Sequence, residues 1–235
     1  MPESLAAEVR ALLANTSTAT LATQLFKRGL KNTFVQGVQR LTPGSMMIGP
    51  ATTVRYIPSR EDLSGPEEYA NRAHPQRRAV EECPPGGVIV MDCRRDPRAA
   101  CAGDIMLTRM QLRGVAGLVT DGGMRDTATL ATLEIAVFAA GPSAPASFHQ
   151  HTAVDLDVPI ACGGVPVYPG DVVVGDADGV VVIPRPIVGE VARDAVEQER
   201  LERFVLEEIR GGRPIFEVYP PDDATKARYR AWQND

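Results

Sequence analysis

The sequence predicts an α/β fold in which a parallel or mixed sheet is covered by helices. Continuous apolar runs alternate with helical stretches between residues 88 and 138, and this alternation is typical of such sheets. Short β-branched runs separated by turns follow after residue 150, and a long charged helix comes after them. Each predicted element has its own signal in the sequence.

For the N-terminal region, the sequence predicts one strand with helices before and after it along the chain. Apolar residues at helical spacing predict two helices within residues 3–30. Residues 46–56 predict a strand that is interrupted at Gly49-Pro50, because glycine and proline usually break regular structure. Residues 60–68 predict a polar surface excursion, and residues 74–83 predict a helix.

The central region alternates between strand and helix. Its predicted strands are continuous apolar runs, as expected for buried strands, and lie at residues 88–91, 117–120 and 135–138. The helices between them are predicted at residues 103–113 and 127–133. This order is the main reason for predicting a parallel or mixed sheet.

The C-terminal region changes to short strands and then to one long helix. The strands are predicted at residues 158–160, 165–167, 172–174 and 180–183, with a hairpin turn at residues 176–179. A charged helix is predicted over residues 187–210, where Gly211-Gly212 stops it. We expect the tail, which contains Trp232, to lie over a neighbouring surface.

Composition and charge exclude several classes of protein. Lys plus Arg number 25 against 30 Asp plus Glu, and the net charge of −5 argues against nucleic-acid binding through a broadly basic surface. No apolar run approaches the ~18 residues of a membrane helix, and the start of the chain lacks the basic-then-apolar order of a signal peptide. The cysteines form no CxxC pair, so we expect buried reduced thiols at Cys83, Cys93, Cys101 and Cys162. We therefore expect a cytoplasmic protein that binds neither nucleic acid nor membranes.

One part of the chain is dense in glycine, carboxylate and arginine. The sequence has no P-loop, no GxGxxG motif after a strand, no HExxH and no GxSxG. The remaining candidates are residues 103–106 (Gly-Asp-Ile-Met) and residues 121–126 (Asp-Gly-Gly-Met-Arg-Asp). The second group follows a predicted buried strand, and ligands of open α/β sheets bind at that end of the strands.

The residue types in these two groups suit an anionic ligand and a metal ion. Gly122 and Gly123 let the backbone turn tightly and bring its N–H groups close to a ligand, and Arg125 can hold a carboxylate with two hydrogen bonds. Asp126 supplies a hard oxygen ligand for Mg²⁺. Asp104 opens a helix whose free N–H groups favour anions. The alternative is structural, with Asp126 capping the helix that follows it.

Asp104, twenty intervening residues and then Arg125-Asp126 form the D-X20-R-D arrangement of the class II pyruvate aldolases that cleave 4-hydroxy-4-methyl-2-oxoglutarate. The chain resembles this family, which also contains the regulator of ribonuclease activity A (RraA). Residues 47–53 and 169–184 resemble further landmarks of the family, and the resemblance spans roughly residues 20–205. It implies a compact α/β sandwich like the phosphohistidine (swivelling) domain, with a mixed sheet flanked by helices.

The resemblance also implies how the chain is organised and what it does. It implies a single domain over residues 1–235, whose C-terminal helix and tail, from about residue 187, pack on a neighbouring subunit of a homotrimer or homohexamer. The implied activity is that of a carbon–carbon lyase, a divalent-metal-dependent pyruvate aldolase that cleaves a 4-hydroxy-2-oxo acid through a metal-stabilised enolate. Decarboxylation of oxaloacetate passes through the same enolate and is expected as a side activity.

The family's site roles carry over to matching residues. Asp126 would bind Mg²⁺ or Mn²⁺, partly through water, Arg125 would hold the pyruvyl part of a small 2-oxo acid substrate, and Asp104 would position the water that shuttles a proton. The substrate carboxylate would be bound at Gly103 and at the amides of Ile105 and Met106. A glutamate of a neighbouring subunit would support the metal, and helix register does not choose between Glu199 and Glu202.

Two other interpretations stay open. The chain could be a protein inhibitor of an endoribonuclease, like the regulator subgroup, or an oligomer with a vestigial site. The presence of Asp104, Arg125 and Asp126 together favours catalysis, because an inhibitor does not need all three. A Schiff-base aldolase is disfavoured because the three lysines, Lys27, Lys31 and Lys226, lie outside the site motif.

Polar residues elsewhere are expected to have less specific roles. Solvated surface positions that could still contact a substrate are predicted for Arg60, Arg72, His74, Arg77 and Arg78. Surface or hydrogen-bonding roles, rather than roles as general bases, are predicted for His149 and His151. Turn positions, not metal ligation, are predicted for Asp171, Asp176 and Asp178.

Overall fold

A computed structural model describes residues 4–44 and 46–233 of the chain. At its centre is an eight-stranded mixed sheet in the order β1-β7-β5-β3-β2-β12-β13, with β9 paired to the C-terminal part of β2. The strands are β1 (Gln39–Arg40), β2 (Met47–Pro58), β3 (Val88–Asp92), β5 (Gly117–Thr120), β7 (Ala136–Ala139), β9 (His151–Leu156), β12 (Val172–Gly175) and β13 (Val180–Ile183). β2, β3, β5 and β7 pair in parallel and the other neighbours pair antiparallel, which confirms the predicted mixed sheet.

The longest strand, β2, runs through the Gly-Pro pair that predicted an interruption. Pro50 pairs with Val172 of β12, although proline has no N–H to donate to a sheet. The N–H of Ala51 donates to the carbonyl of Asp171 at 2.8 Å, so the nitrogen of Pro50, one residue earlier, faces the other side of the strand. On that side, pairing with β3 begins only at Ala51 and Val88. The predicted interruption is therefore wrong, because this strand loses no ladder hydrogen bond at the proline.

A second, smaller sheet follows the central strands. β4 (Ala100–Ala102) comes after β3, β6 (Gly123–Met124) after β5 and β8 (Gly141–Pro142) after β7, and they pair in parallel in the order β4-β6-β8. A separate hairpin is made of β10 (Ile160–Cys162) and β11 (Val165–Val167). The small parallel sheet brings the chain leaving β4 next to the chain leaving β6.

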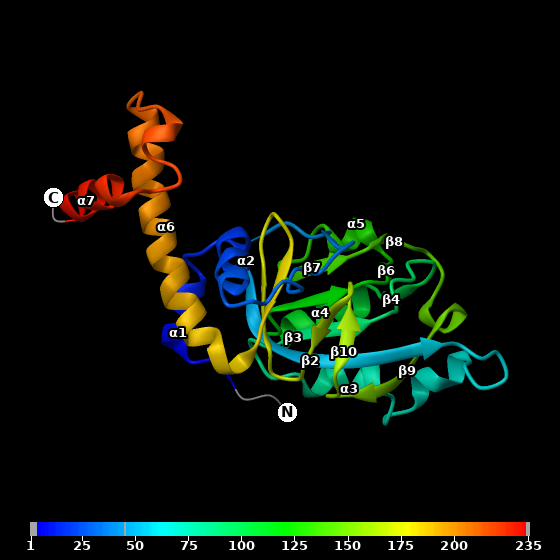
Figure 1. Ribbon diagram of the computed structural model, residues 1–235. Helices are drawn as coiled ribbons and strands as arrows, with labels where there is room; N and C mark the ends of the chain where they lie inside the picture. The colour runs from blue at the N-terminus through cyan, green and yellow to red at the C-terminus, as the bar shows by residue number, and fades with distance from the viewer. Residues whose placement is uncertain (1–3, 45, 234–235) are drawn as a thin grey trace.

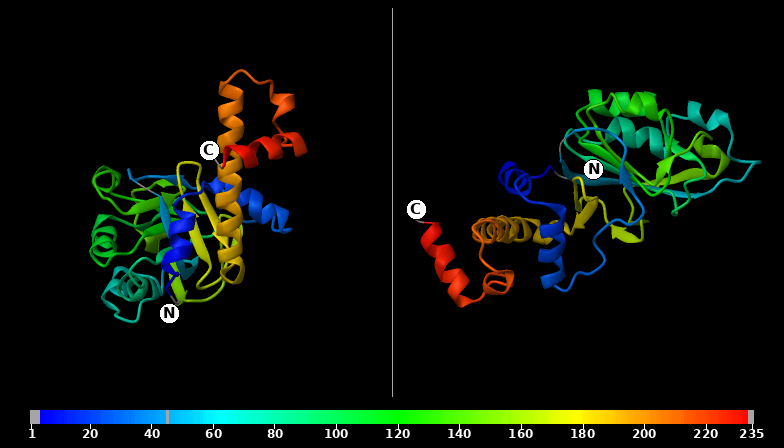
Figure 2. Two further views of the ribbon diagram at one scale, coloured as in Figure 1. Left: turned by 90° about the vertical axis from the view of Figure 1, so that its left-hand side faces the viewer. Right: turned by 90° about the horizontal axis from the view of Figure 1, so that it is seen from above.

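Alternate side chains of the central strands fill two apolar layers. Ile89 and Met91 pack in the layer formed with α3 (Pro75–Glu82), α4 (Asp104–Leu112) and α5 (Thr127–Leu130). Val88 and Val90 point to the opposite face and pack with β10 and β11. The helices lie together on one side of the strands in the right-hand view of Figure 2. α5 ends at Leu130 rather than at residue 133, and the other predicted central elements are confirmed within a residue or so.

A third apolar layer joins the N-terminal helices to β12 and β13. α1 (Ala7–Leu13) and α2 (Thr18–Lys27) pack here with the first half of α6 (Val188–Arg210), as Figure 1 shows. Asp176 in the turn of the predicted hairpin accepts hydrogen bonds from the N–H and the hydroxyl of Thr18, both at 2.7 Å. The two predicted N-terminal helices and the hairpin are confirmed by the bounds of α1 and α2 and by the antiparallel pairing of β12 with β13.

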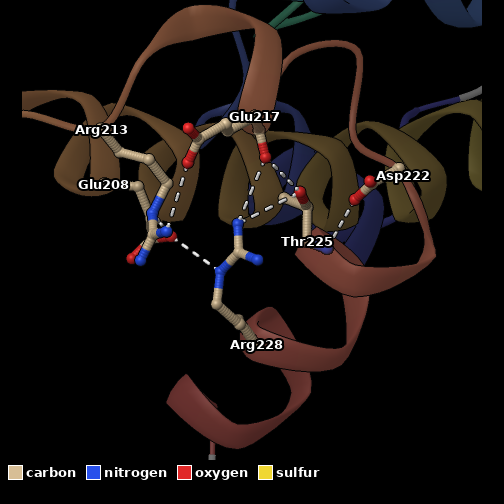
Figure 3. A network of polar contacts seen from close by, with 6 residues as sticks. All are labelled: Glu208, Arg213, Glu217, Asp222, Thr225 and Arg228. Carbon is tan, nitrogen blue, oxygen red and sulfur yellow. Dashed lines mark hydrogen bonds and ion pairs between the residues drawn. The ribbon is translucent and has the colours of Figure 1, made fainter.

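The second half of α6 projects from the body and carries α7 (Asp223–Trp232), as Figures 1 and 2 show. We call residues 204–233 the C-terminal arm. Its apolar cluster consists of Phe204, Val205, Val218 and Tyr229. Glu208 accepts from Nε of Arg213 at 2.7 Å and from Nε of Arg228 at 2.8 Å, which ties α7 to α6 (Figure 3). The tail therefore folds back on its own helix, and packing of the arm on a neighbouring subunit stays a prediction.

The fold is a mixed α/β fold with a curled sheet flanked by helices, and its likeness to the phosphohistidine domain stays a prediction. All four cysteines are buried and none is in a disulfide, which confirms the predicted reduced thiols. Over residues 4–44 and 46–233, no helix combines the length and the apolar character needed to cross a membrane.

Candidate active site

The two halves of the D-X20-R-D pattern meet at the end of the small parallel sheet. Asp104 begins α4 directly after β4, and Arg125-Asp126 follows β6. The N–H of Arg125 donates to the carbonyl of Ala102 at 3.2 Å, which extends the β4–β6 pairing by one residue. α4 and β5 occupy most of the intervening residues and return the chain to the same end of the small parallel sheet.

Asp126 lies at the centre of this group and has a left-handed backbone, with φ 60° and ψ 36°. Such a conformation costs a non-glycine residue about 1–2 kcal/mol, although aspartate tolerates it better than most. Its Oδ2 accepts from the N–H of Asp104 at 3.3 Å and from Nε of Arg125 at 3.2 Å. It makes no side-chain capping bond with α5. Asp126 is therefore the N-cap residue of α5 through its backbone, whose carbonyl accepts from the N–H groups of Thr129 and Leu130, but its side chain does not cap that helix.

Gly103 leaves the space that Asp126 occupies. Its φ of −142° and ψ of −169° are extended values that any residue adopts, so its backbone does not require glycine. A Cβ at Gly103, however, would overlap Oδ2 of Asp126 and would lie 3.0 Å from Cγ of Arg125. The glycine is needed because the Asp126 carboxylate approaches the start of α4 so closely.

These residues line a hollow of about 230 Å³. The side chain of Asp126 is 33% exposed and that of Arg125 is 45% exposed, so a small ligand can reach both. Arg77 of α3 lies on the same wall, together with Ile105 and Met106. The hollow therefore offers two guanidinium groups beside carboxylates, a combination suited to an anion bound together with a cation.

The start of α4 is covered by its own first residue. Oδ1 of Asp104 accepts from the N–H of Ile105 at 2.7 Å. The first N–H groups of a helix have no partner inside the helix and attract anions. In this arrangement the Asp104 carboxylate occupies the place where a ligand carboxylate would be expected to bind.

The hollow offers oxygen ligands for a metal, from Asp104 and Asp126. Within the described ranges, no group of three or more His, Cys, Asp or Glu side chains is placed to hold an ion. Mg²⁺ usually takes one or two carboxylates and keeps several waters, and Mn²⁺ also prefers carboxylate and water. The donor set fits such an ion with part of its water shell, and it does not fit a zinc site built from several nitrogen or sulfur ligands.

The glycine pair of residues 121–126 has a packing role. The N–H of Gly122 donates to Oγ1 of Thr120 at 3.0 Å, and the N–H of Gly123 donates to the carbonyl of Ala99 at 3.2 Å. A Cβ on Gly122 would lie 2.7 Å from Cβ of Cys93. The prediction that these glycines bring N–H groups to a ligand is wrong, because the Thr120 hydroxyl and the Ala99 carbonyl already accept from those groups.

Asp121 is a structural residue whose role the sequence did not indicate. It is buried, and its two oxygens accept from the N–H of Cys93 at 2.6 Å and from the N–H of Gly163 at 3.0 Å. Burial raises the pKa of Asp121 in spite of these hydrogen bonds. It ties the end of β3 to the turn of the β10–β11 hairpin.

The two glutamates proposed to reach a neighbouring subunit lie on α6 and are bonded within their own chain. Oε1 of Glu199 accepts from the N–H and the hydroxyl of Ser17, both at 2.9 Å. Burial raises the pKa of Glu199, but the hydrogen bonds from Ser17 and Thr20 outweigh it and hold the pKa below its usual range. Glu202 accepts from Gln198 at 2.8 Å. A role of either glutamate at a neighbour's metal stays a prediction.

The histidines divide into one exposed and two buried side chains. His149 is exposed, whereas His74 is 7% exposed and His151 is 2% exposed. Burial lowers the pKa of both buried histidines. Nδ1 of His151 lies 3.0 Å from Nη2 of Arg94, which agrees with its predicted hydrogen-bonding role. The surface prediction for His74 is wrong because the chain encloses it beside Phe148 and His151.

The predicted surface arginines are exposed, namely Arg60, Arg72, Arg77 and Arg78. Arg77 differs from Arg60 because it also lines the hollow with Asp126. No sequence motif links Arg77 to the site, since only the packing of α3 beside α4 brings it there. Asp171 has the predicted turn role, with its carboxylate accepting from the N–H of Tyr168 at 2.9 Å.

Comparison with protein families matches residues 18–182 to the RraA-like family, described as aldolase/RraA. The chain belongs to the RraA-like family. The matched span contains β4, α4, β6 and the candidate site, so the family expected from the D-X20-R-D pattern is confirmed.

Individual relatives of this RraA-like protein carry different names. A protein of Halalkalibacterium halodurans, named as a candidate 4-hydroxy-4-methyl-2-oxoglutarate aldolase, is 34% identical over 194 residues, which is 80% of this chain and 85% of that protein. A crystal structure of Streptomyces coelicolor RraAS2, described as an unusual member of the RNase ES inhibitor RraA family, superposes with a TM-score of 0.76 at 32% identity. That match covers 86% of this chain and 97% of the other. An uncharacterised protein of Pseudomonas syringae pv. tomato superposes with a TM-score of 0.78 at 26% identity, over 92% and 98% of the two chains.

Proposed function

We propose that this chain is a divalent-metal-dependent pyruvate aldolase that cleaves a 4-hydroxy-2-oxo acid. The placement of Asp126 carries the proposal. Its side chain makes no cap bond to the following helix and, from a left-handed backbone, accepts from the N–H of Asp104 and from Arg125. The carboxylate therefore lines the hollow, where a ligand can reach it. The name of the H. halodurans relative supports the same activity.

Each residue of the hollow has a role in this reaction. Arg125 binds the carboxylate or keto oxygen of the pyruvyl part and stabilises the negative charge that develops there. The substrate carboxylate takes the N–H groups of Ile105 and Met106, beside Gly103, and displaces the Asp104 carboxylate from Ile105. Asp104 is then available to hold a water. The water held by Asp104 accepts the proton of the C4 hydroxyl as the C3–C4 bond breaks to give a new carbonyl and the pyruvate enolate, and the same water then returns a proton to C3.

Asp126, with Asp104 nearby, would hold Mg²⁺ or Mn²⁺ through oxygen atoms and water. When bound, such an ion polarises the 2-oxo group of the substrate. Glu199 or Glu202 of a neighbouring subunit would add support through water in a homotrimer or homohexamer, with the C-terminal helix and tail on that neighbour. We further propose that the protein acts in the cytoplasm and decarboxylates oxaloacetate as a side activity.

A second function is favoured by one comparison. The S. coelicolor relative is described within a family of RNase ES inhibitors, so this chain could instead regulate an endoribonuclease through protein contact. Such a role needs a complementary surface and does not need Asp126 or a metal. The two functions therefore differ in their dependence on the hollow.

The test is pyruvate release from 4-hydroxy-4-methyl-2-oxoglutarate and from oxaloacetate, with Mg²⁺ and again with EDTA. We expect metal-dependent release that Asp126→Asn abolishes and that Arg125→Ala reduces mainly in kcat. Asp62→Asn is the matched control, because Asp62 is an exposed carboxylate paired with Arg60 away from the hollow. Release that survives EDTA or Asp126→Asn would contradict the proposed site. Absence of release from both substrates, in a folded protein with metal, would favour the regulator.

A further inference from the structure

The strand that leads into the candidate site, β4, contains a one-residue register shift. The N–H of Gly123 in β6 donates to the carbonyl of Ala99 at 3.2 Å. In a regular parallel ladder the N–H of Arg125, two residues later, would donate to the carbonyl of Cys101. It donates instead to the carbonyl of Ala102, also at 3.2 Å, and the Cα pairing of β4 with β6 shifts at the same place. Cys101 is therefore the extra residue of a β-bulge.

A buried glutamine binds the carbonyl that the ladder bypasses. Gln76, the second residue of α3, donates from Nε2 to the carbonyl of Cys101. Gln76 is 0% exposed and Cys101 is 1% exposed, so water does not reach this pair. A buried carbonyl without a donor costs free energy. The amide of Gln76 therefore stabilises the shifted register of β4.

The other end of the same amide is unpaired. Oε1 of Gln76 is buried and has no hydrogen-bond partner among the residues that the structure describes. Burying a polar atom in this way destabilises a fold. An apolar side chain of similar volume, such as methionine, would avoid that cost. What the amide adds over such a side chain is the hydrogen bond to the Cys101 carbonyl.

The register of β4 decides which residue meets Asp126. Asp104 is the second residue after the carbonyl that Arg125 binds, and its N–H donates to Oδ2 of Asp126 at 3.3 Å. If Arg125 bound the Cys101 carbonyl instead, the chain would move along by one residue, about 3.3 Å. Gly103 would then occupy the place of Asp104, because a slip of one residue turns each side chain to the other face.

We propose that Gln76 is a positioning residue, which holds the bulge at Cys101 and so places Asp104 beside Asp126. This inference rests on the proposed function, since Asp104 and Asp126 are the residues that would hold the water and the metal. Gln76 does not line the hollow, whereas residues 100–102 of β4 form part of its wall. Gln76 therefore acts on the site through the backbone of β4 and not by touching a ligand.

The test replaces Gln76 by methionine, which keeps the length of the side chain and removes the amide. Pyruvate release from 4-hydroxy-4-methyl-2-oxoglutarate gives kcat and KM, and electron paramagnetic resonance gives the affinity for Mn²⁺, both on the full-length protein. We expect Gln76→Met to lower kcat about 100-fold with a smaller change in KM, because small displacements of a site have large effects on rate. Mn²⁺ affinity should fall about 10- to 100-fold, as for other residues that orient metal ligands.

Thr42→Val is the matched control. Thr42 is buried and lies outside the hollow, and its hydroxyl donates to the carbonyl of Ile135 at 2.9 Å. Removing this bond should lower the midpoint of urea denaturation and leave kcat and Mn²⁺ affinity unchanged. A merely structural role of Gln76 predicts the same behaviour for Gln76→Met, and that result would overturn the inference.

A second variant decides the question if Gln76→Met does not fold. Gln76→Glu has almost the same shape, but its carboxyl can donate to the Cys101 carbonyl only when it is protonated. Its kcat, divided by that of the unmodified protein at the same pH, should therefore fall as the pH rises through the pKa of the new carboxyl, which burial raises. A ratio that is the same at every pH would contradict the role of the hydrogen bond.

Failure of this inference can be distinguished from failure of the proposed function. Full kcat and full Mn²⁺ affinity in folded Gln76→Met would refute the role of Gln76 and keep the aldolase. If the unmodified protein releases no pyruvate, the proposed function fails, and a crystal structure of Gln76→Met decides the inference. A hydrogen bond from the N–H of Arg125 that moves from Ala102 to Cys101 would support the positioning role, and an unchanged register would refute it.

Discussion

Adding one methyl group at Gly103 should disable the site while leaving the fold intact. In Gly103→Ala the new Cβ would approach Oδ2 of Asp126 more closely than real Cβ atoms approach any heavy atom, and it would lie 3.0 Å from Cγ of Arg125. Non-bonded carbon contacts are most favourable at about 3.5–4.0 Å. The flexible Asp126 carboxylate therefore has to move by about 1 Å, a displacement that can cost about 100-fold in rate.

The same substitution should change stability little. The backbone of Gly103 is extended, so alanine adopts it without strain. Gly103 is the N-cap of α4, and replacing a glycine cap by alanine costs at most about 1 kcal/mol. We therefore expect a loss of about 100-fold in kcat/KM together with an unfolding free energy within about 1 kcal/mol of the unmodified protein.

The assay pairs pyruvate-release kinetics with urea denaturation. Gly189→Ala is the matched control, because its added Cβ would meet the nearest heavy atoms at 3.6 and 4.0 Å, which is ordinary van der Waals contact. That variant should keep full activity. Unchanged kcat/KM in Gly103→Ala would show that the observed position of Asp126 is not needed for turnover. A loss of unfolding free energy as large as the free-energy equivalent of the lost kcat/KM would show that the substitution disturbs the whole fold rather than the site.

Three further changes test the rest of the structure. Asp121→Ala leaves two buried N–H groups without acceptors and should lower the unfolding free energy by about 2–5 kcal/mol; a loss below 1 kcal/mol by urea denaturation would contradict its role as a tie. The guanidinium of Arg98 lowers the pKa of Asp96 to about 2 from 3.8, so this carboxylate stabilises the fold above about pH 4 and the effect disappears as the pH falls towards 2. Asp96→Asn should therefore cost about 1 kcal/mol or less at neutral pH and nothing near pH 2, because Arg98 is mostly exposed; equal losses at both pH values would refute this. Glu208→Gln should weaken both ion pairs of the C-terminal arm and speed amide exchange in α7 but not in α4, and unchanged exchange in α7 would show that the apolar cluster alone holds it.

The sequence predicted the central strands and most helices because their signals are local. A run such as residues 88–91 is apolar at every position, which is the pattern expected of a strand buried on both faces. The small parallel sheet was missed because β4, β6 and β8 have three residues or fewer, too short for any periodicity. The continuity of β2 through Pro50 depends on where β3 begins, which is a property of the sheet rather than of the proline.

The site was predicted only in part, because the fold rather than a sequence pattern brings some of its residues together. The D-X20-R-D spacing located Asp104, Arg125 and Asp126, and the structure places the three side by side. Whether the side chain of Asp126 would cap α5 or turn away from it depends on one backbone conformation that the sequence does not specify. The position of Arg77 depends on packing between helices far apart in the chain, so neither composition nor spacing could indicate it.

The left-handed backbone of Asp126 has a consequence for anyone who evolves this protein in the laboratory. The conformation is one that glycine adopts freely and asparagine adopts readily, whereas aspartate is held in it by the surrounding structure. The backbone conformation alone therefore gives no reason to keep a carboxylate at this position. A library randomised at residue 126 and screened for heat tolerance should drift towards glycine and asparagine, while a screen for pyruvate release should return aspartate.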